Sequence, residues 1–164
     1  MAVLSPTSGR IEDITDNKIF IYIPIEANHL IYSPIDGVIN SISFERGLFA
    51  NSRFVSEPYK TGKLHIFALD QKNREVFFSI EVGKPAYVTD TIDFYKEKND
   101  QIKKGEIIGE IILGSRCSIE ADREVFIVNP NLRKHSVVVG GSTILFFKRV
   151  EKSIKEVYDF DHIT

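Results

Sequence analysis

The chain has 164 residues, one cysteine and a formal net charge of −2, and 43% of its residues are hydrophobic. This composition is typical of a globular protein with a real core, and the charge lacks the basic excess of a nucleic-acid-binding protein. A single cysteine excludes an internal disulfide framework and a cysteine-rich zinc site.

No apolar run is long enough to span a membrane, and the first residues are too short for a signal peptide. We therefore expect a protein that is cytoplasmic or peripherally attached to a membrane. None of the four histidines stands at metal-ligand spacing from another histidine, a cysteine or a carboxylate, so no metal site is expected.

The N-terminal part of the chain contains one turn sequence twice. Ser-Pro-x-x-Gly occurs at residues 5–9 and again at residues 33–37, and an apolar stretch follows each copy. Proline fixes φ and glycine permits positive φ, so both copies are predicted to be tight turns that lead into strands. Residues 1–18 are otherwise rich in turn signals, and strands are predicted over 19–23 and 38–42.

The middle of the chain contains its longest irregular segment, residues 45–63. Such a loop is either a surface connection or a functional loop. After this segment, strands are predicted over residues 64–69, 75–82 and 86–92. The charged residues 93–104 are predicted to form a solvated connection or a helical turn.

The last third of the chain begins with an apolar run, residues 106–112, that predicts a buried strand. Further short strands are predicted over 124–128, 136–139 and 143–150, and residues 151–164 are expected to be a short helix or a frayed tail. Many short strands without a convincing amphipathic helix predict an all-β fold, a sandwich-like barrel. We expect one domain over residues 1–164, with its core at about 5–148.

A Gly-Ser pair, Gly114-Ser115, follows the apolar run. At such a pair a chain can attack itself, because the serine hydroxyl reaches the preceding carbonyl and glycine leaves room for the rearrangement. An ordinary turn is the other interpretation of the same two residues.

Two further residues, His29 and Cys117, have side chains that can take part in catalysis. His29 lies between a predicted strand and a Ser-Pro turn, where loops often carry catalytic groups. Cys117 lies next to a predicted strand and is expected to be a small core residue rather than a nucleophile.

Taken together, these elements resemble the phosphatidylserine decarboxylases, particularly the short forms, from residue 5 to about residue 148. The resemblance depends on the order and spacing of five motifs. These are the family's Ser-Pro-Ala-Asp-Gly turn, its histidine-bearing loop, its Val-Gly-Ala-x-x-Val element, its Lys-Gly-x-x-x-Gly strand with the Gly-Ser pair, and its final glycine turn, matched here by 5–9, 21–37, 82–88, 104–116 and 139–145.

The resemblance implies an enzyme that makes its own pyruvoyl group. Ser115 would attack the Gly114 carbonyl to give an ester, and elimination would free residues 1–114. The dehydroalanine left at position 115 would hydrolyse to a pyruvoyl group and ammonia. This carbonyl would condense with the amine of phosphatidylserine and accept electrons while carbon dioxide leaves, which yields phosphatidylethanolamine. His29 would act as a general acid or base.

Two positions depart from the family pattern. Ser8 stands where the family has the aspartate of its first turn, and Tyr32 stands where it has the second histidine of the loop. In the family these two groups form the processing triad with the serine. A phenol titrates far above neutral pH, and a serine cannot orient an imidazole by charge. Asp36, in the second turn, is a possible substitute.

These departures leave a second hypothesis open, a homologue that does not process itself and serves as a binding or structural module. A third hypothesis is a sandwich-barrel carrier or phosphotransferase domain, because such barrels also use Ser-Pro-x-x-Gly turns. Residues 62–65 have a weak likeness to a phosphohistidine site, with His65 as the acceptor. The partners to be considered are a phospholipid substrate, a membrane surface contacted near residues 45–59 and a second copy of the chain, with no nucleic acid.

Overall fold

The computed structural model describes residues 2–45, 62–82, 92–112 and 116–150. The described residues form strands and no helix, so the all-β prediction is confirmed, and they supply no helix that could cross a membrane. The strands are β1 (Ala2–Leu4), β2 (Gly9–Ile14), β3 (Lys18–Tyr22), β4 (Leu30–Tyr32), β5 (Gly37–Glu45), β6 (Lys63–Asp70), β7 (Glu75–Glu81), β8 (Ile92–Phe94), β9 (Gln101–Ile102), β10 (Ile107–Ile111), β11 (Arg116–Ala121), β12 (Phe126–Val128), β13 (Val137–Val138) and β14 (Ile144–Lys148).

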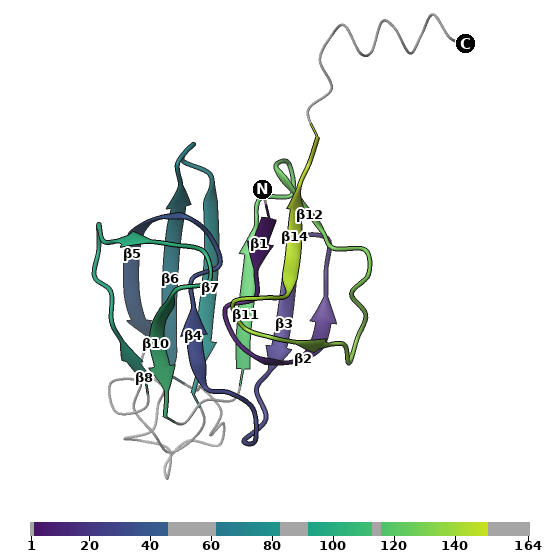
Figure 1. Cartoon of the computed structure of the whole chain (residues 1–164), viewed down its shortest axis with the longest axis horizontal. Helices are drawn as coiled ribbons and strands as arrows, with labels where there is room; N and C mark the ends of the chain where they lie inside the picture. Colours follow the sequence, from purple (N-terminus) through teal and green to yellow (C-terminus); the bar gives the residue numbers. More distant parts are fainter. Residues whose placement is uncertain (1, 46–61, 83–91, 113–115, 151–164) are drawn as a thin grey trace, which may run out of the picture.

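These strands form three antiparallel sheets. The largest has eight strands in the order β13-β2-β3-β11-β7-β6-β5-β9. The two others have three strands each, in the orders β1-β14-β12 and β4-β10-β8. Figure 1 shows the small sheets side by side in front of the large one, with β4, β10 and β8 before β5 to β7 and with β1, β14 and β12 before β2, β3 and β11.

The core fills the space between the large sheet and the small ones. Strand β6 shows why the sequence builds it, because its residues alternate in burial along the whole strand. Leu64, Ile66 and Ala68 are completely buried, whereas His65 and Phe67 between them are only half-buried. Successive side chains of a strand point to opposite faces, so this alternation gives the large sheet an apolar inner face and a mixed outer face.

The two Ser-Pro-x-x-Gly segments form equivalent turns, as predicted. In the first, the Ser5 hydroxyl donates a hydrogen bond of 2.6 Å to the carbonyl oxygen of Thr7. In the second, the Ser33 hydroxyl donates one of 2.7 Å to the carbonyl oxygen of Ile35. The first turn joins β1 to β2 and the second joins β4 to β5, so the repeat in the sequence corresponds to a repeat in the fold.

Backbone hydrogen bonds connect the two turns reciprocally. The Leu4 amide donates to the Pro34 carbonyl at 3.0 Å, and the Tyr32 amide donates to the Pro6 carbonyl at 2.8 Å. The last part of the strand before each turn is therefore hydrogen-bonded to the proline of the other turn. Because the strands before both turns belong to different small sheets, these bonds hold the two halves of the fold together.

The glycine that ends each turn is required by a close approach of two backbones. A Cβ atom at Gly9 would overlap the carbonyl oxygen of Tyr22, and one at Gly37 would overlap that of Leu69. Relief of such a clash would need a backbone shift, because neither obstacle is a flexible side chain. The glycine of the repeated motif thus allows the backbone of the neighbouring strand to approach closely.

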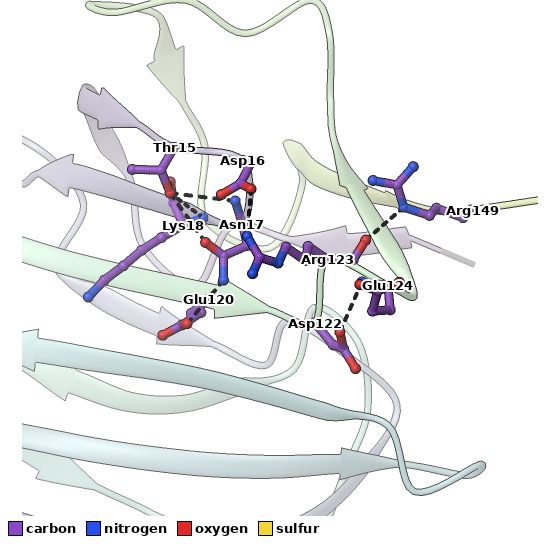
Figure 2. Close-up of polar contacts among 9 residues, drawn as sticks. All are labelled: Thr15, Asp16, Asn17, Lys18, Glu120, Asp122, Arg123, Glu124 and Arg149. Atoms are coloured by element: carbon purple, nitrogen blue, oxygen red, sulfur yellow. Dashed lines mark hydrogen bonds and ion pairs between the residues drawn. The ribbon is translucent and has the colours of Figure 1, made fainter.

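A polar cluster joins the turn between β2 and β3 to the connection between β11 and β12 (Figure 2). Asn17 donates to Glu120 at 3.1 Å, and Arg123 pairs with Asp16 at 3.1 Å. Arg149, just after β14, donates to the carbonyl of Arg123 at 2.7 Å. The cluster marks the end of the large sheet that lies away from the predicted cleavage site.

Most predicted strands are confirmed with small shifts at their ends. The strand expected after the first turn is β2. The sequence did not predict β1, and Cys117 lies within β11 rather than next to a strand. Residues 93–104, expected to be a solvated connection or a helical turn, contain the end of β8 and all of β9. Most of the irregular segment 45–63, most of the predicted strand 86–92 and the tail 151–164 lie outside the described residues.

Candidate active site

The predicted cleavage site lies between the end of β10 and the start of β11. Gly114 and Ser115 are outside the described residues, whereas Ile112 and Arg116 on either side are described. Arg116 lies directly opposite Tyr22 of β3 on one side and Glu81 of β7 on the other. The position of Arg116 therefore fixes this site at one end of the large sheet.

His29 lies at the same end, immediately before β4. Its carbonyl oxygen accepts a hydrogen bond of 2.7 Å from the amide of Ile111, the last residue of β10. Its imidazole is anchored as well, because Nε2 lies 3.2 Å from the carbonyl oxygen of Pro24. Ile111 precedes Ser115 by four residues, so covalent reach alone keeps the Cα atoms of these two residues within about 14 Å. The sequence separates His29 from this region by more than eighty positions, and strand pairing brings them together.

Ser8 and Tyr32, the two positions that depart from the family pattern, meet at one glycine turn. The Ser8 hydroxyl oxygen accepts a hydrogen bond of 2.9 Å from the amide of Gly140. The ring of Tyr32 packs on the same residue, since a Cβ atom at Gly140 would lie 2.6 Å from Cδ2 of that ring. The structure thus brings Ser8 and Tyr32 to the same residue, Gly140.

The chemistry of this pair is limited to hydrogen bonding. The Tyr32 hydroxyl accepts a hydrogen bond of 2.8 Å from Nδ2 of Asn28, and the Ser8 hydroxyl accepts one from the backbone. Neither a phenol nor an alcohol removes a proton at neutral pH as a carboxylate–imidazole pair does. Sequence reasoning missed Asn28. In an extended chain, side chains two positions apart lie on the same face, so residues 28, 30 and 32 share one face, and this spacing would have placed Asn28 on the side of Tyr32.

Asp36, the suggested substitute for Ser8, lies at the other end of the large sheet. One of its carboxylate oxygens accepts a hydrogen bond of 2.7 Å from the amide of Lys104. Its neighbour Gly37 is opposite Asp70, the last residue of β6, whereas Lys63 at the start of β6 is in the row of Arg116. The length of β6 separates the two ends by about 23 Å. In this arrangement Asp36 cannot replace the family's aspartate.

The first turn also reaches the strand that carries the cleavage site. Thr7 is completely buried, and no nitrogen or oxygen atom of the described residues forms a hydrogen bond with its hydroxyl. It lies beside the thiol of Cys117, two positions after Ser115. Burial raises the pKa of Cys117 to about 12, and the Thr7 hydroxyl opposes this shift only in part. Cys117 is a core residue, as predicted from the sequence.

Arg116 directly follows the predicted cleavage site in the sequence and carries a charge. Its guanidinium makes two hydrogen bonds of 3.2 Å to the carboxylate of Glu12 and lies 3.9 Å from that of Glu81. This pairing fixes the start of β11 against its neighbouring strands. Within the described ranges no group of three histidine, cysteine or acidic side chains could hold a metal ion.

Comparison with known proteins identifies the origin of this arrangement. Residues 2–146 match the phosphatidylserine decarboxylase family. The chain belongs to this family. The match includes both turns, His29 and the Gly114-Ser115 pair, so the resemblance stated from the motifs is confirmed.

Individual members of the family are distant from this chain. Two proteins named as archaetidylserine decarboxylase proenzymes, from Methanosarcina barkeri and Methanosarcina acetivorans, are 28% and 27% identical over 87% and 96% of the chain. The phosphatidylserine decarboxylase proenzyme of Neisseria gonorrhoeae is 27% identical over 72% of it. The chain spans about two thirds of the length of the archaeal relatives, at 66% and 69%, and 48% of the bacterial one.

The raised pKa of Cys117 leads to a prediction that distinguishes this thiol from a catalytic nucleophile. At pH 8 a thiol with a pKa of about 12 is ionised about 1,000-fold less than one at the reference value of 9.0. We expect a thiol-specific disulfide reagent to leave Cys117 unmodified at pH 8 and to modify it fully in denaturant. Fast modification of the folded chain, measured by absorbance, would show an exposed and activated thiol.

Proposed function

We propose that the chain is a proenzyme that cuts itself between Gly114 and Ser115 and then decarboxylates phosphatidylserine to phosphatidylethanolamine. Membership of the decarboxylase family and the presence of the Gly-Ser pair support this proposal. The observation that carries it is the hydrogen bond between the His29 carbonyl and the Ile111 amide. This bond ties the one histidine of the loop to the strand that leads into the cleavage site.

Self-cleavage conserves every atom except for one water taken up and one ammonia lost. The Ser115 hydroxyl adds to the Gly114 carbonyl carbon, the peptide C–N bond breaks and an ester forms. Loss of the Cα proton of residue 115 then expels the Gly114 carboxylate and leaves dehydroalanine. Its imine tautomer takes up water and releases ammonia, which leaves a pyruvoyl group at the new N-terminus. The first and second steps each need a proton acceptor.

The described residues at this end of the sheet are compatible with a pyruvoyl group at position 115. Once formed, a pyruvoyl group would supply a carbonyl that condenses with the substrate amine and accepts the electron pair released when carbon dioxide leaves. His29 is half-buried, and its backbone is fixed to β10 on the approach to residue 115. An imidazole in this position can donate a proton to the carbon from which carbon dioxide has left. His29 is thus proposed as the general acid of the decarboxylation.

The substrate is proposed from the chemistry shared by the relatives' names. Those names specify a serine head group on two kinds of lipid, phosphatidyl and archaetidyl. The serine head group contains both the amine that reacts and the carboxylate that leaves. We therefore assign specificity to the head group and propose phosphatidylserine as a substrate.

We expect the purified protein to release carbon dioxide from phosphatidylserine vesicles. Ser115→Ala should abolish this activity because no pyruvoyl group can form. His29→Gln should reduce it by about 100-fold to 10,000-fold, the usual contribution of a positioned acid or base, while the chain is still cut. Archaetidylserine vesicles provide the comparison for lipid class. Undiminished activity of His29→Gln would remove His29 from the mechanism, and a cut wild-type chain without activity would refute the substrate.

A homologue that does not process itself is the second candidate, and the Ser8–Tyr32 pair favours it. Both hydroxyls already accept hydrogen bonds, from Gly140 and Asn28, and neither residue supplies a base. The phosphotransferase hypothesis has no comparable support. Both ring nitrogens of His65 are engaged, by Ser79 at 2.7 Å and by Glu45 at 2.9 Å, so neither is available to accept a phosphoryl group.

A double substitution distinguishes a slow processing site from an absent one. Ser8→Asp with Tyr32→His restores the carboxylate and imidazole of the family pattern, and we expect it to accelerate chain cleavage by at least about 10-fold. Ser8→Asn with Tyr32→Phe is the matched control, since it changes the same positions without adding a base. Gel electrophoresis over time measures both rates. Equal rates in the two variants would show that these positions take no part in processing.

We further propose that this end of the molecule meets the membrane. Ile25 and Ile112 are 86% and 63% exposed, and both lie next to groups that bond to His29. Exposed aliphatic side chains gain about 1.5–3 kcal/mol each when they leave water, which suits shallow insertion among lipid chains. The reactive end of the chain would then face the head groups.

Substitution of both isoleucines tests the membrane-facing end. Ile25→Asp with Ile112→Asp should lower the fraction of protein bound to phosphatidylserine vesicles at least about 10-fold, through lost burial and added repulsion. Val150→Asp is the control, because Val150 is 88% exposed and lies just beyond β14, beside the polar cluster at the other end. Equal loss of binding in the control, measured by vesicle flotation, would contradict the assignment.

A further inference from the structure

The outer face of the large sheet contains a hollow that the proposed decarboxylation does not use. Its volume is about 260 Å³, which suits a group the size of a lipid head group rather than a large ligand. Its floor and walls come from four adjacent strands, β3, β11, β7 and β6. The residues that line it are Lys18, Phe20, Lys63, His65, Phe77, Ser79, Glu81, Arg116 and Ser118.

One row of directly opposed residues forms the centre of this hollow. Phe20 lies opposite Ser118, Ser118 opposite Ser79, and Ser79 opposite His65. Neighbouring strands are about 4.8 Å apart, so the row places two hydroxyls between two rings across about 14 Å. Phe77 extends the wall on the His65 side, where the two rings stack at 5.6 Å.

Three polar side chains in and beside the hollow form a hydrogen-bonded series. The Ser79 hydroxyl lies 2.7 Å from Nδ1 of His65, and Nε2 of His65 lies 2.9 Å from a carboxylate oxygen of Glu45. Ser79 is only 6% exposed, whereas the side chain of Glu45 is 59% exposed. The series thus runs from the floor of the hollow out to solvent.

The series resembles a hydrolytic triad, but its setting does not suit acyl transfer. Ser79 is in the middle of β7, which pairs on one side with β11 and on the other with β6. Backbone amides in such a strand are used by the sheet, so they cannot stabilise an oxyanion. Ser79 therefore suits binding better than nucleophilic attack.

The charges around the floor favour a negatively charged ligand. Of the described residues, Lys18, Lys63 and Arg116 line the hollow, and Glu81 is the one carboxylate among them. Within the described part of the chain, the ion pairs include Arg116 but neither lysine. Figure 2 shows the Lys18 side chain directed away from the polar cluster at its own strand end, and its Nζ lies 4.9 Å from the Phe20 ring centre. Two ammonium groups are therefore available to an anion.

We propose that this hollow binds a small phosphomonoester, and that protonation of His65 strengthens the binding by freeing the Ser79 hydroxyl. A phosphate accepts hydrogen bonds from hydroxyls and ammonium groups in many directions, and the rings of Phe20 and Phe77 can contact its organic substituent. The ligand can come from a free metabolite or from a phosphomonoester lipid head group. The site is on the opposite face of the sheet from Tyr32 and Gly140.

The proton dependence follows from the donors and acceptors of the series. Glu45 is an acceptor only, so the proton on Nε2 of His65 stays directed toward it. In neutral His65, Nδ1 is an acceptor, so the Ser79 hydroxyl donates its hydrogen bond to it. When Nδ1 gains a proton it donates to the Ser79 oxygen, and the serine O–H turns toward the hollow. Protonation therefore adds both a positive charge and a donor to the site.

Other charged groups surround His65 and must be considered in any pH experiment. They are two carboxylates and three cations. Those facing it are Glu45 of β5, Glu81 of β7, Lys63 of β6 itself, Arg116 of β11 and Lys18 of β3.

Binding of two small probes to the full chain tests the proposal. Phenyl phosphate combines the phosphate with a ring, and we expect its amide shift changes in nuclear magnetic resonance spectra to centre on β3, β11, β7 and β6. At about pH 5.5, Lys63→Gln and Ser79→Ala should each weaken its binding about 10-fold. Glu75→Gln, at the exposed far end of β7, is the matched control and should leave affinity unchanged. Shift changes elsewhere, or equal affinity in all variants, would overturn the assignment.

Sulfate tests the proton dependence, because its charge stays constant between about pH 5.5 and pH 8 whereas that of phosphate does not. Wild-type chain should bind sulfate several-fold more tightly at about pH 5.5 than at pH 8, and His65→Gln should remove this dependence while circular dichroism shows an intact fold. A pH dependence that survives in His65→Gln would refute the role of His65.

Vesicles containing phosphatidic acid distinguish the two sources of the ligand. If such vesicles compete with phenyl phosphate and neutral vesicles do not, the ligand is a lipid head group, and competition by soluble glycerol phosphate alone identifies a free metabolite. Failure of both to compete would overturn the ligand class. These experiments measure binding, so Ser115→Ala should give the same affinities, and their outcome is independent of whether the chain cuts itself.

Discussion

Two backbone hydrogen bonds, from Leu4 to Pro34 and from Tyr32 to Pro6, determine how the two halves of this fold meet. They set β4 in place, and β4 in turn aligns β10, whose last amide bonds to His29. The positions of the histidine and of the strand that enters the cleavage site therefore both depend on the same pair of interlocked turns. The turns are therefore part of the architecture of the proposed active site as well as of the core.

The equivalence of the turns also explains where this chain differs from its family. The second turn keeps an aspartate, Asp36, and uses it to hold the Lys104 amide. The first turn has Ser8, which holds the corresponding Gly140 amide in the same way. An oxygen that accepts from the backbone is thus common to both positions, and the difference between them is the negative charge. Ser8 carries no charge but accepts the backbone hydrogen bond at this position.

Local sequence signals predicted the class of the fold, the turns and the strands of the core, because proline, glycine and burial periodicity act over a few residues. They failed where tertiary pairing dominates, as in β1 and β9, whose three and two residues become strands only beside β14 and β5. The same limit applies to the site. The repeated turn in the sequence could not show that Asp36 lies at the end of the large sheet away from the predicted cleavage site. Likewise, His65, Ser79 and Ser118 lie in one row only because of the strand register.

The central claim is that a divergent processing site still produces a pyruvoyl group at residue 115. The mass of the freshly purified, denatured wild-type chain measures this most directly. The account predicts two chains, residues 1–114 and a C-terminal chain whose mass and blocked N-terminus match a pyruvoyl group. A single chain of full mass, with an intact Gly114–Ser115 bond after prolonged incubation, would contradict it.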